Sequence, residues 1–456
     1  MLTYQLKKAP GIPLYEDLYR CIRADILSGV LAANQKLPSK RALCANLKVS
    51  KITVETAYQQ LLSEGYIRSE EKVGYFVEAL SRPQEVSAQA PPQEVPAKAK
   101  KEALIDLTAN GPVHFPFSVW SKLQREVLLD LGEQLLLPLH NQGLPELRQA
   151  IATHLRQFRG MQVDPENILI GAGTDFLYNL LIQLLGRDKT YAVEEPGYGK
   201  IRKIYAAAGA KCVSAVMDSD GVLPDLDAHV LHISPSHHFP TGIVTPLPRR
   251  QALLRWAKEG GRYIIEDDYD SEFRFSAHPL PTLQSMDGGQ QVIYMNTFSK
   301  TLAPSIRISY MVLPPALMGE FRKKLGFYSC TVPSFHQYTL ARFIDRGHFE
   351  KHINRMRKRY KALRNRVLSA LEGCPFAEKL TVREENAGLH FLVKVDTHIS
   401  DAALTDWCRQ NGIQVQSLGE FYHGAVPETA KRQLVINYSG LTEEDLQHLE
   451  QLLTKS

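Results

Sequence analysis

The stretch N-T-F-S-K-T-L-A-P-S-I-R, residues 296–307, places Lys300 in a short polar turn, seven residues before Arg307. It follows the strand-like apolar run 292–295. A lysine at a protein surface is ordinary, so these residues alone define no site. Their meaning depends on what the rest of the chain brings near them.

The composition describes a globular chain with a large core. It has 456 residues, 44% of them hydrophobic and 23% charged, and at ~100–200 residues per domain this length predicts two or three domains. No signal-like N-terminus and no apolar run of about 18 residues is present, so we expect a cytoplasmic protein. Six scattered cysteines without a close pair predict neither a metal site nor disulfides and fit a reducing compartment.

Residues 79–104 divide the chain into two parts. This segment is rich in Pro, Ala, Gln and charged residues and has no sustained apolar period. It is typical of a flexible linker, which as a coil would span roughly 25–30 Å. We therefore expect a head at 1–78, which carries a small excess of basic residues, and a nearly neutral body at 105–456.

The head has the pattern of a helix-turn-helix with a wing. Helical periodicity begins after Pro13, and Ser39 and Ser50 are candidate N-caps of two further helices. Two short strands around E-E-K-V-G-Y-F-V follow. The second helix of such a motif enters the major groove by its N-terminal end, where backbone N–H groups, hydroxyls and cations meet phosphates.

The motifs L-P-S-K-R, V-S-K-I-T-V, A-Y-Q-Q-L-L-S-E-G-Y and G-Y-F-V resemble the winged-helix domain of GntR-family transcription regulators. This resemblance implies DNA contacts from six residues of the helices and wing. They are Arg41, Ser50, Lys51, Thr53, Lys72 and Gly74. A winged helix used for protein contacts remains the alternative.

The body alternates strand and helix patterns, which predicts an α/β sheet with functional groups at strand ends. The candidate groups lie in G-A-G-T (171–174), P-G-Y (196–198), S-P-S-H-H-F-P-T-G (234–242), E-D-D-Y-D (266–270) and the opening stretch. They supply an anion cradle, an aromatic face, carboxylates, a phenol and a lysine. A phosphorylated pyridine aldehyde requires this combination.

The body resembles fold-type I pyridoxal-phosphate aminotransferases, and head and body together resemble the MocR group of regulators. The resemblance implies that Lys300 forms an aldimine with pyridoxal 5′-phosphate, that Asp267 pairs with the pyridine nitrogen, and that Tyr269 bonds the ring oxygen. It implies that Tyr198 stacks on the ring. The implied phosphate ligands are Gly173, Thr174, Thr297, Ser299 and Arg307. It also implies a large aminotransferase-like domain, a smaller C-terminal α+β domain and a homodimer.

The sequence departs from the aminotransferase pattern at two positions. Val435, in V-I-N-Y-S-G-L, stands where these enzymes have an arginine for the substrate α-carboxylate, and Arg432 lies three residues earlier. Phe239 replaces the usual loop asparagine, and His237 and His238 before it have no assigned role. Losing a bidentate arginine costs roughly 1.5–3 kcal/mol.

This departure favours a body that senses rather than catalyses. We expect a DNA-binding regulator for which pyridoxal phosphate itself is the signal, as in regulators of vitamin B6 synthesis. Three alternatives remain open: a response to an amino acid or amine through the cofactor, a working aminotransferase, and a protein adaptor.

Overall fold

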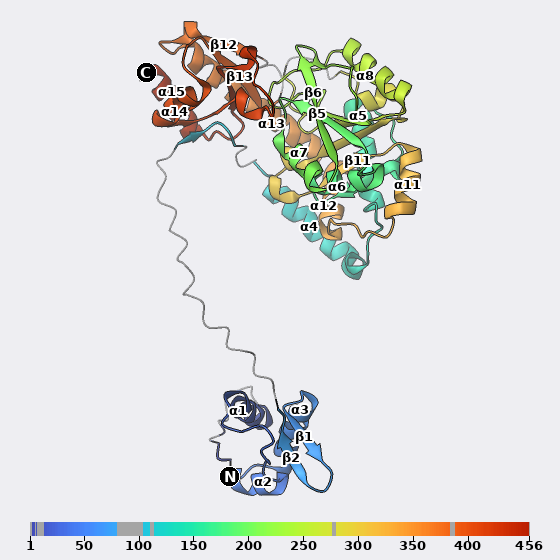
Figure 1. The fold of residues 1–456 in the computed structure, drawn as a ribbon, viewed down its shortest axis with the longest axis vertical. Helices are drawn as coiled ribbons and strands as arrows, with labels where there is room; N and C mark the ends of the chain where they lie inside the picture. The colour runs from blue at the N-terminus through green and yellow to red at the C-terminus, as the bar shows by residue number, and fades with distance from the viewer. Residues whose placement is uncertain are drawn as a thin grey trace. The chain divides into compact units, whose positions relative to one another are not determined.

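The computed structural model describes residues 2–4, 6, 13–79, 104–109, 114–275, 280–383 and 388–455. The chain forms two compact units, Met1–Ala99 and Lys100–Ser456, and each is described by itself (Figure 1). Apart from its end residues, the linker expected over 79–104 lies outside the described residues.

The first unit is a winged helix. It comprises α1 (Leu14–Ser28), α2 (Lys40–Leu47), α3 (Lys51–Ser63), β1 (Ile67–Glu70) and β2 (Gly74–Val77), with the two strands antiparallel. The side chain of Ser39 accepts a hydrogen bond from the backbone N–H of Ala42, and Ser50 accepts one from Thr53. Both predicted N-caps are therefore confirmed, and they fix where α2 and α3 begin.

One aromatic pair ties the wing to the helices. The Tyr58 ring on α3 lies edge-on to Tyr75 on β2, with centroids 5.0 Å apart, and the Tyr58 hydroxyl donates to the Pro38 carbonyl at 3.0 Å. The backbone N–H of Leu37 donates to the Tyr75 carbonyl at 2.8 Å. These contacts fix the wing relative to the start of α3.

The second unit is built on an eight-stranded sheet. Its strands are β4 (Ile168–Gly171), β5 (Thr190–Glu195), β6 (Lys211–Asp218), β7 (Gly221–Val222), β8 (Val230–Ile233), β9 (Tyr263–Asp267), β10 (Val292–Thr297) and β11 (Ser309–Val312). Their order is β4-β11-β10-β9-β8-β5-β6-β7. The central pairs from β6 to β10 are parallel, whereas β11 and β7 pair antiparallel with their neighbours.

Helices cover both faces of this sheet. They are α4 (Phe117–Leu131), α5 (Pro145–Arg159), α6 (Thr174–Leu185), α7 (Gly199–Ala207), α8 (Leu247–Gly260), α9 (Leu283–Asp287), α10 (Phe298–Thr301), α11 (Pro315–Leu325) and α12 (Ser334–Asp345). On β10, Tyr294 belongs to the core shared with α4, α5 and α12, while Ile293 and Met295 belong to the core shared with α6, α7 and α11. Strands buried on both faces explain the apolar runs in the sequence.

A smaller α+β part follows the long helix α13 (His348–Glu372). It contains α14 (Asp401–Gln410), α15 (Glu443–Lys455), and a four-stranded antiparallel sheet, whose order is β12 (Leu380–Arg383), β13 (His390–Val395), β16 (Gln433–Asn437) and β15 (Gln416–Ser417). The short strands β3 (Ile105–Asp106) and β14 (Ile413–Gln414) pair with each other in parallel. The predicted fold class is confirmed in both units. Within the described ranges, no helix is long and apolar enough to cross a membrane.

Candidate functional site

Lys300 lies at the end of β10 in the one-turn helix α10, rather than in the polar turn expected from the sequence. Thr297 caps this helix by accepting a hydrogen bond from the backbone N–H of Ser299 at 3.1 Å. Ser309 on β11 donates to the same hydroxyl at 2.7 Å. Burial lowers the pKa of Lys300, and the nearby Asp270 carboxylate acts in the opposite direction. A lysine with a lowered pKa is more readily a neutral nucleophile.

Asp267 is the last residue of β9 and is 5% exposed. The Tyr178 hydroxyl donates to Oδ2 of Asp267 at 2.5 Å, and Nε2 of His232 lies 3.4 Å from the same oxygen. The other oxygen, Oδ1, is buried and has no hydrogen-bond partner in the described structure. Buried polar atoms are nearly always paired, so Oδ1 is free to accept a bond from a ligand.

Two further residues hold Asp267, and neither was expected from the sequence. Tyr178 lies in the apolar run of α6, and burial, with the Asp267 charge added, raises the pKa of its phenol well above the ordinary value. His232 lies within β8, and its Nδ1 is 2.7 Å from the Tyr205 hydroxyl. No sequence pattern distinguishes these residues from ordinary core side chains.

The start of α6 and Arg307 form the candidate anion cradle. Gly173 is the N-cap of α6 with φ of 90°, and the guanidinium of Arg307 donates to the Ala172 carbonyl at 3.3 Å. A Cβ on Gly173 would lie 2.1 Å from Nη2 of Arg307, so only glycine allows this approach. The Ser299 hydroxyl is also buried and unpaired within the described residues. Free N–H groups of a helix start, a cation and a hydroxyl suit a phosphate.

Two tyrosines flank the same region. Tyr269 follows β9 by two residues, and its hydroxyl lies 3.4 Å from Nδ1 of His237. Burial, together with Asp270, raises the pKa of Tyr269 well above its ordinary value, so the phenol remains a hydrogen-bond donor. Tyr198 precedes α7, is 50% exposed, and lies edge-on to Phe239 at 6.1 Å between centroids.

These groups fit pyridoxal 5′-phosphate. The unpaired Asp267 Oδ1 matches a protonated ring nitrogen, the unpaired Ser299 hydroxyl and the α6 start match phosphate oxygens, and Lys300 matches the aldehyde. The unpaired polar atoms of this site thus match the hydrogen-bonding groups of the cofactor.

The two loop histidines are buried beside this set. Nδ1 of His237 lies 2.9 Å from Oδ2 of Asp270, and Nδ1 of His238 lies 2.7 Å from the Thr241 hydroxyl. Burial lowers the pKa of His238 to about 3, with the neighbouring His237 contributing, so its ring stays neutral at physiological pH.

Val435 occupies an apolar environment. It lies on β16, is 4% exposed, and packs in a cluster with Leu392, Leu418 and Ala430. The Arg432 guanidinium donates to Oε1 of Glu428 at 2.5 Å. The guanidinium of Arg432 is therefore already paired with a carboxylate.

The predicted DNA-contacting residues gather at the start of α3, on α2 and on the wing. Arg41, Lys51 and Lys72 are exposed, and the hydroxyls of Ser50 and Thr53 lie 2.7 Å apart. Ile52, which the sequence pattern did not single out, is 74% exposed in the first turn of α3. An apolar side chain at this position suits contact with a thymine methyl group.

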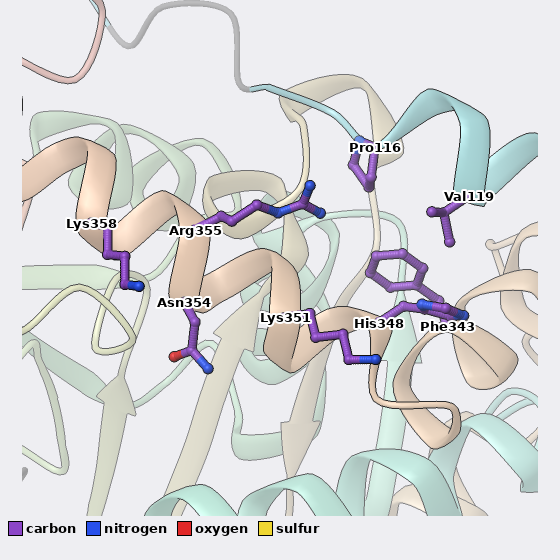
Figure 2. A pocket seen from close by; sticks show the side chains of 8 residues that line it. All are labelled: Pro116, Val119, Phe343, His348, Lys351, Asn354, Arg355 and Lys358. Atoms are coloured by element: carbon purple, nitrogen blue, oxygen red, sulfur yellow. The ribbon is translucent and has the colours of Figure 1, made fainter.

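A separate hollow of about 490 Å³ lies between α4 and α13 (Figure 2). The side chains of Lys351, Arg355 and Lys358 on α13 line it, together with Val119 and Phe343. It contains none of the predicted cofactor residues, so it is distinct from the site around Lys300.

Two family models match the chain. The model described as bacterial regulatory proteins of the gntR family matches residues 14–77, and that of aminotransferase class I and II matches residues 102–453. Fold and site together define a class of transcription regulator in which a winged helix-turn-helix is joined to an aminotransferase-like domain.

Relatives define the family more closely. The probable rhizopine catabolism regulatory protein MocR of Rhizobium meliloti is 32% identical over 459 residues, covering 96% of this chain and 92% of that protein. The pyridoxine biosynthesis transcriptional regulator PdxR of Corynebacterium glutamicum is 30% identical over 413 residues, covering 88% and 87%. The chain belongs to the MocR group of GntR-family transcription regulators.

Solved structures resemble the second unit. The multiple substrate aminotransferase of Thermococcus profundus matches with a TM-score of 0.68 and 24% identity, covering 78% of this chain and 91% of that one. The α-aminoadipate aminotransferase LysN of Thermus thermophilus, complexed with N-(5′-phosphopyridoxyl)-L-leucine, matches with 0.65 and 23%, covering 77% and 92%. At such identities the likeness establishes the fold and not the substrate.

Proposed function

We propose that this regulator holds pyridoxal 5′-phosphate through Lys300 and changes its DNA binding in response to the cofactor. Lys300 would bind the aldehyde carbon covalently, Asp267 would accept from the ring nitrogen through Oδ1, and Tyr269 would donate to the ring oxygen. When bound, the cofactor supplies an aldehyde carbon that can bond covalently to an amine and an electron-poor ring conjugated to it. The phosphopyridoxyl ligand in LysN, a fold neighbour, supports this assignment.

The remaining residues would bind the two ends and one face of the cofactor. Tyr198 would stack on the ring, a contact of about 1 kcal/mol. The phosphate would lie against the helix start and the cation, bound by Gly173, Thr174, Thr297, Ser299 and Arg307. The Tyr178–Asp267 hydrogen bond orients the carboxylate so that Oδ1 remains available.

The main support for a sensing function is the presence of Val435 in place of an arginine. The cofactor groups are present, but the position of the carboxylate-binding arginine is held by a valine in an apolar cluster. This combination supports a site that binds the cofactor more readily than it turns over an α-amino acid. The relative named as a pyridoxine biosynthesis regulator supports control of vitamin B6 synthesis as the output.

The second candidate is a response to an amine that binds beside the cofactor. It is favoured by the buried histidines near Lys300, which an α-carboxylate would not require. In either case the head would bind promoter DNA through Arg41, Ser50, Lys51, Thr53, Lys72 and Gly74, and a homodimer would present two heads to two half-sites.

Mapping of the chromosomal sites that the full chain binds tests this function. We expect a site upstream of genes for pyridoxal phosphate synthesis, and a reporter from that promoter should change when the cofactor supply is limited. Occupancy only at promoters unrelated to the cofactor, with a reporter indifferent to its supply, would contradict the vitamin B6 assignment.

A further inference from the structure

Two buried histidines meet beside Lys300. His237 comes from the loop after β8, and His390 from the first position of β13 in the C-terminal sheet. Their ring centroids lie 4.5 Å apart, and the residues are 2% and 3% exposed. Gly388 packs on His237 so closely that a Cβ there would lie 1.7 Å from Cε1. Burial lowers the pKa of His390 well below its ordinary value, and the neighbouring His237, His238 and Lys300 contribute to this lowering.

The contacts of each ring determine which nitrogen carries the proton. Nδ1 of His237 lies 2.9 Å from the Asp270 carboxylate, which accepts, so Nδ1 donates. His390 makes a hydrogen bond to the backbone of Pro240, where only a carbonyl is available, so the ring nitrogen there also donates. In both residues Nε2 is buried and has no partner in the described structure. A neutral imidazole with a donating Nδ1 presents a lone pair at Nε2.

When its ring is neutral, each histidine therefore presents a buried hydrogen-bond acceptor, Nε2, that has no donor in the described structure. Native interiors rarely leave such atoms unpaired. A donor group of a ligand, such as an ammonium or a hydroxyl, would satisfy them. A carboxylate would instead face two lone pairs and the negative charge of Asp270 behind His237.

The arginines near the two histidines do not make a carboxylate a better ligand than a hydrogen-bond donor. Val435 lies in the apolar cluster, and Arg432 is bonded to Glu428. Arg274 is the cation that a carboxylate could use instead, because its Nη1 is buried and unpaired in the described structure. Burial lowers the pKa of Arg274, with Arg159 adding to the effect, and the charges of Asp268 and Asp270 already oppose that lowering.

We propose that His237 and His390 form an acceptor site beside Lys300 that recognises an effector amine carrying a second ammonium or a hydroxyl group in place of a carboxylate. The chemical class is a diamine or an amino alcohol. This inference rests on the proposed function, because such an effector would bind next to the cofactor held by Lys300.

Calorimetry on the full chain loaded with pyridoxal phosphate tests the proposal with four ligands of equal chain length. They are 1,3-diaminopropane, 3-amino-1-propanol, β-alanine and propylamine, which differ only in their terminal group. We expect the diamine to bind at least about tenfold more tightly than β-alanine and propylamine, the size of one charge-assisted hydrogen bond. We expect the amino alcohol also to bind more tightly than those two, by the smaller factor of a neutral hydrogen bond.

Two variants test whether the ligand preference depends on His390. His390→Phe keeps a ring of similar shape but removes the acceptor, so the preference should fall to about threefold or less while the absorbance of lysine-bound cofactor is unchanged. His154→Phe replaces a half-buried histidine, which lies against Phe158 and Phe349, and should retain the full preference.

The possible failures are distinguishable. Tightest binding of β-alanine, lost in Arg274→Met, would overturn the acceptor site in favour of a carboxylate site at Arg274. Cofactor absorbance without any preference among the four ligands would overturn the acceptor site and leave the proposed function intact. Absence of lysine-bound cofactor in the wild-type chain would overturn both.

Discussion

Gly173 and Arg307 are packed so closely that a Cβ on Gly173 would lie 2.1 Å from Nη2 of Arg307. The two residues are far apart in the sequence, yet together they shape the anion cradle at the start of α6. Arg307 itself has φ of 51°, in the left-handed region that non-glycine residues seldom adopt. The guanidinium is thus brought over the helix start by an unusual backbone conformation at both positions.

We predict that Gly173→Ala weakens the binding of pyridoxal phosphate. The added methyl group would displace the guanidinium and strain a backbone with φ of 90°. Losing one charge-assisted phosphate contact corresponds to about 10–100-fold in affinity. Gly319→Ala is the matched control, because a Cβ there meets nothing within 4 Å. Equal affinities of the two variants, measured by absorbance titration, would show that the phosphate lies elsewhere.

We also expect the Tyr178–Asp267 hydrogen bond to strengthen cofactor binding. Tyr178→Phe removes the donor to Oδ2, so the carboxylate loses its orientation and binding should weaken about 3–10-fold. Tyr191→Phe removes the hydroxyl of another core tyrosine, which donates to the carbonyl of Gly186 at 2.9 Å, at the opposite end of α6 from Gly173. It should lower the melting temperature without changing cofactor affinity. If both variants affect binding alike, Tyr178 has only a packing role.

On the DNA side, Arg41→Ala and Lys51→Ala should each weaken promoter binding without altering the cofactor absorbance. If each residue meets one phosphate, the slope of log affinity against log salt should decrease by about 0.9 per variant. Arg20→Ala serves as control, since this arginine is exposed on α1 and already paired with Glu16. Unchanged binding by both variants across a salt series would contradict the placement of the recognition helix.

We expect Glu272 to make the stability of the folded chain depend on pH. Burial, with the Asp268 charge adding to it, raises the pKa of Glu272 to about 8. Because the folded pKa lies above the unfolded value, its contribution is complete below about pH 4.5 and is lost as the pH rises through about 8. The melting temperature of Glu272→Gln should therefore fall less between pH 6 and pH 9, by a few degrees. Exposed Glu372→Gln should follow the wild-type profile; parallel profiles for all three would refute the prediction.

Local patterns made much of this fold predictable. The caps Ser39 and Ser50, the wing turn and the strands before Asp267 and Lys300 were all readable, because capping, hairpin turns and buried parallel strands leave short-range signals. The position of Gly173 at a helix start followed from the same kind of pattern.

Contacts between distant segments were not predictable. Tyr178 and His232 lie in an apolar helix and an apolar strand, and only the packing of the sheet brings them to Asp267. His390 reaches His237 from the C-terminal sheet, across more than 150 residues of sequence. Lys300 was expected in a turn, because four residues of helix carry too little periodicity to be recognised.

The most direct test of the central claim is a titration of cofactor-free chain with pyridoxal phosphate. Absorbance of lysine-bound cofactor and binding to promoter DNA from its own gene are followed in the same samples, for the wild type and for Lys300→Ala. We predict that the DNA affinity of the wild type changes in step with the absorbance, and that the Lys300→Ala variant shows neither response. Saturating absorbance with an unchanged DNA affinity in the wild type would contradict it.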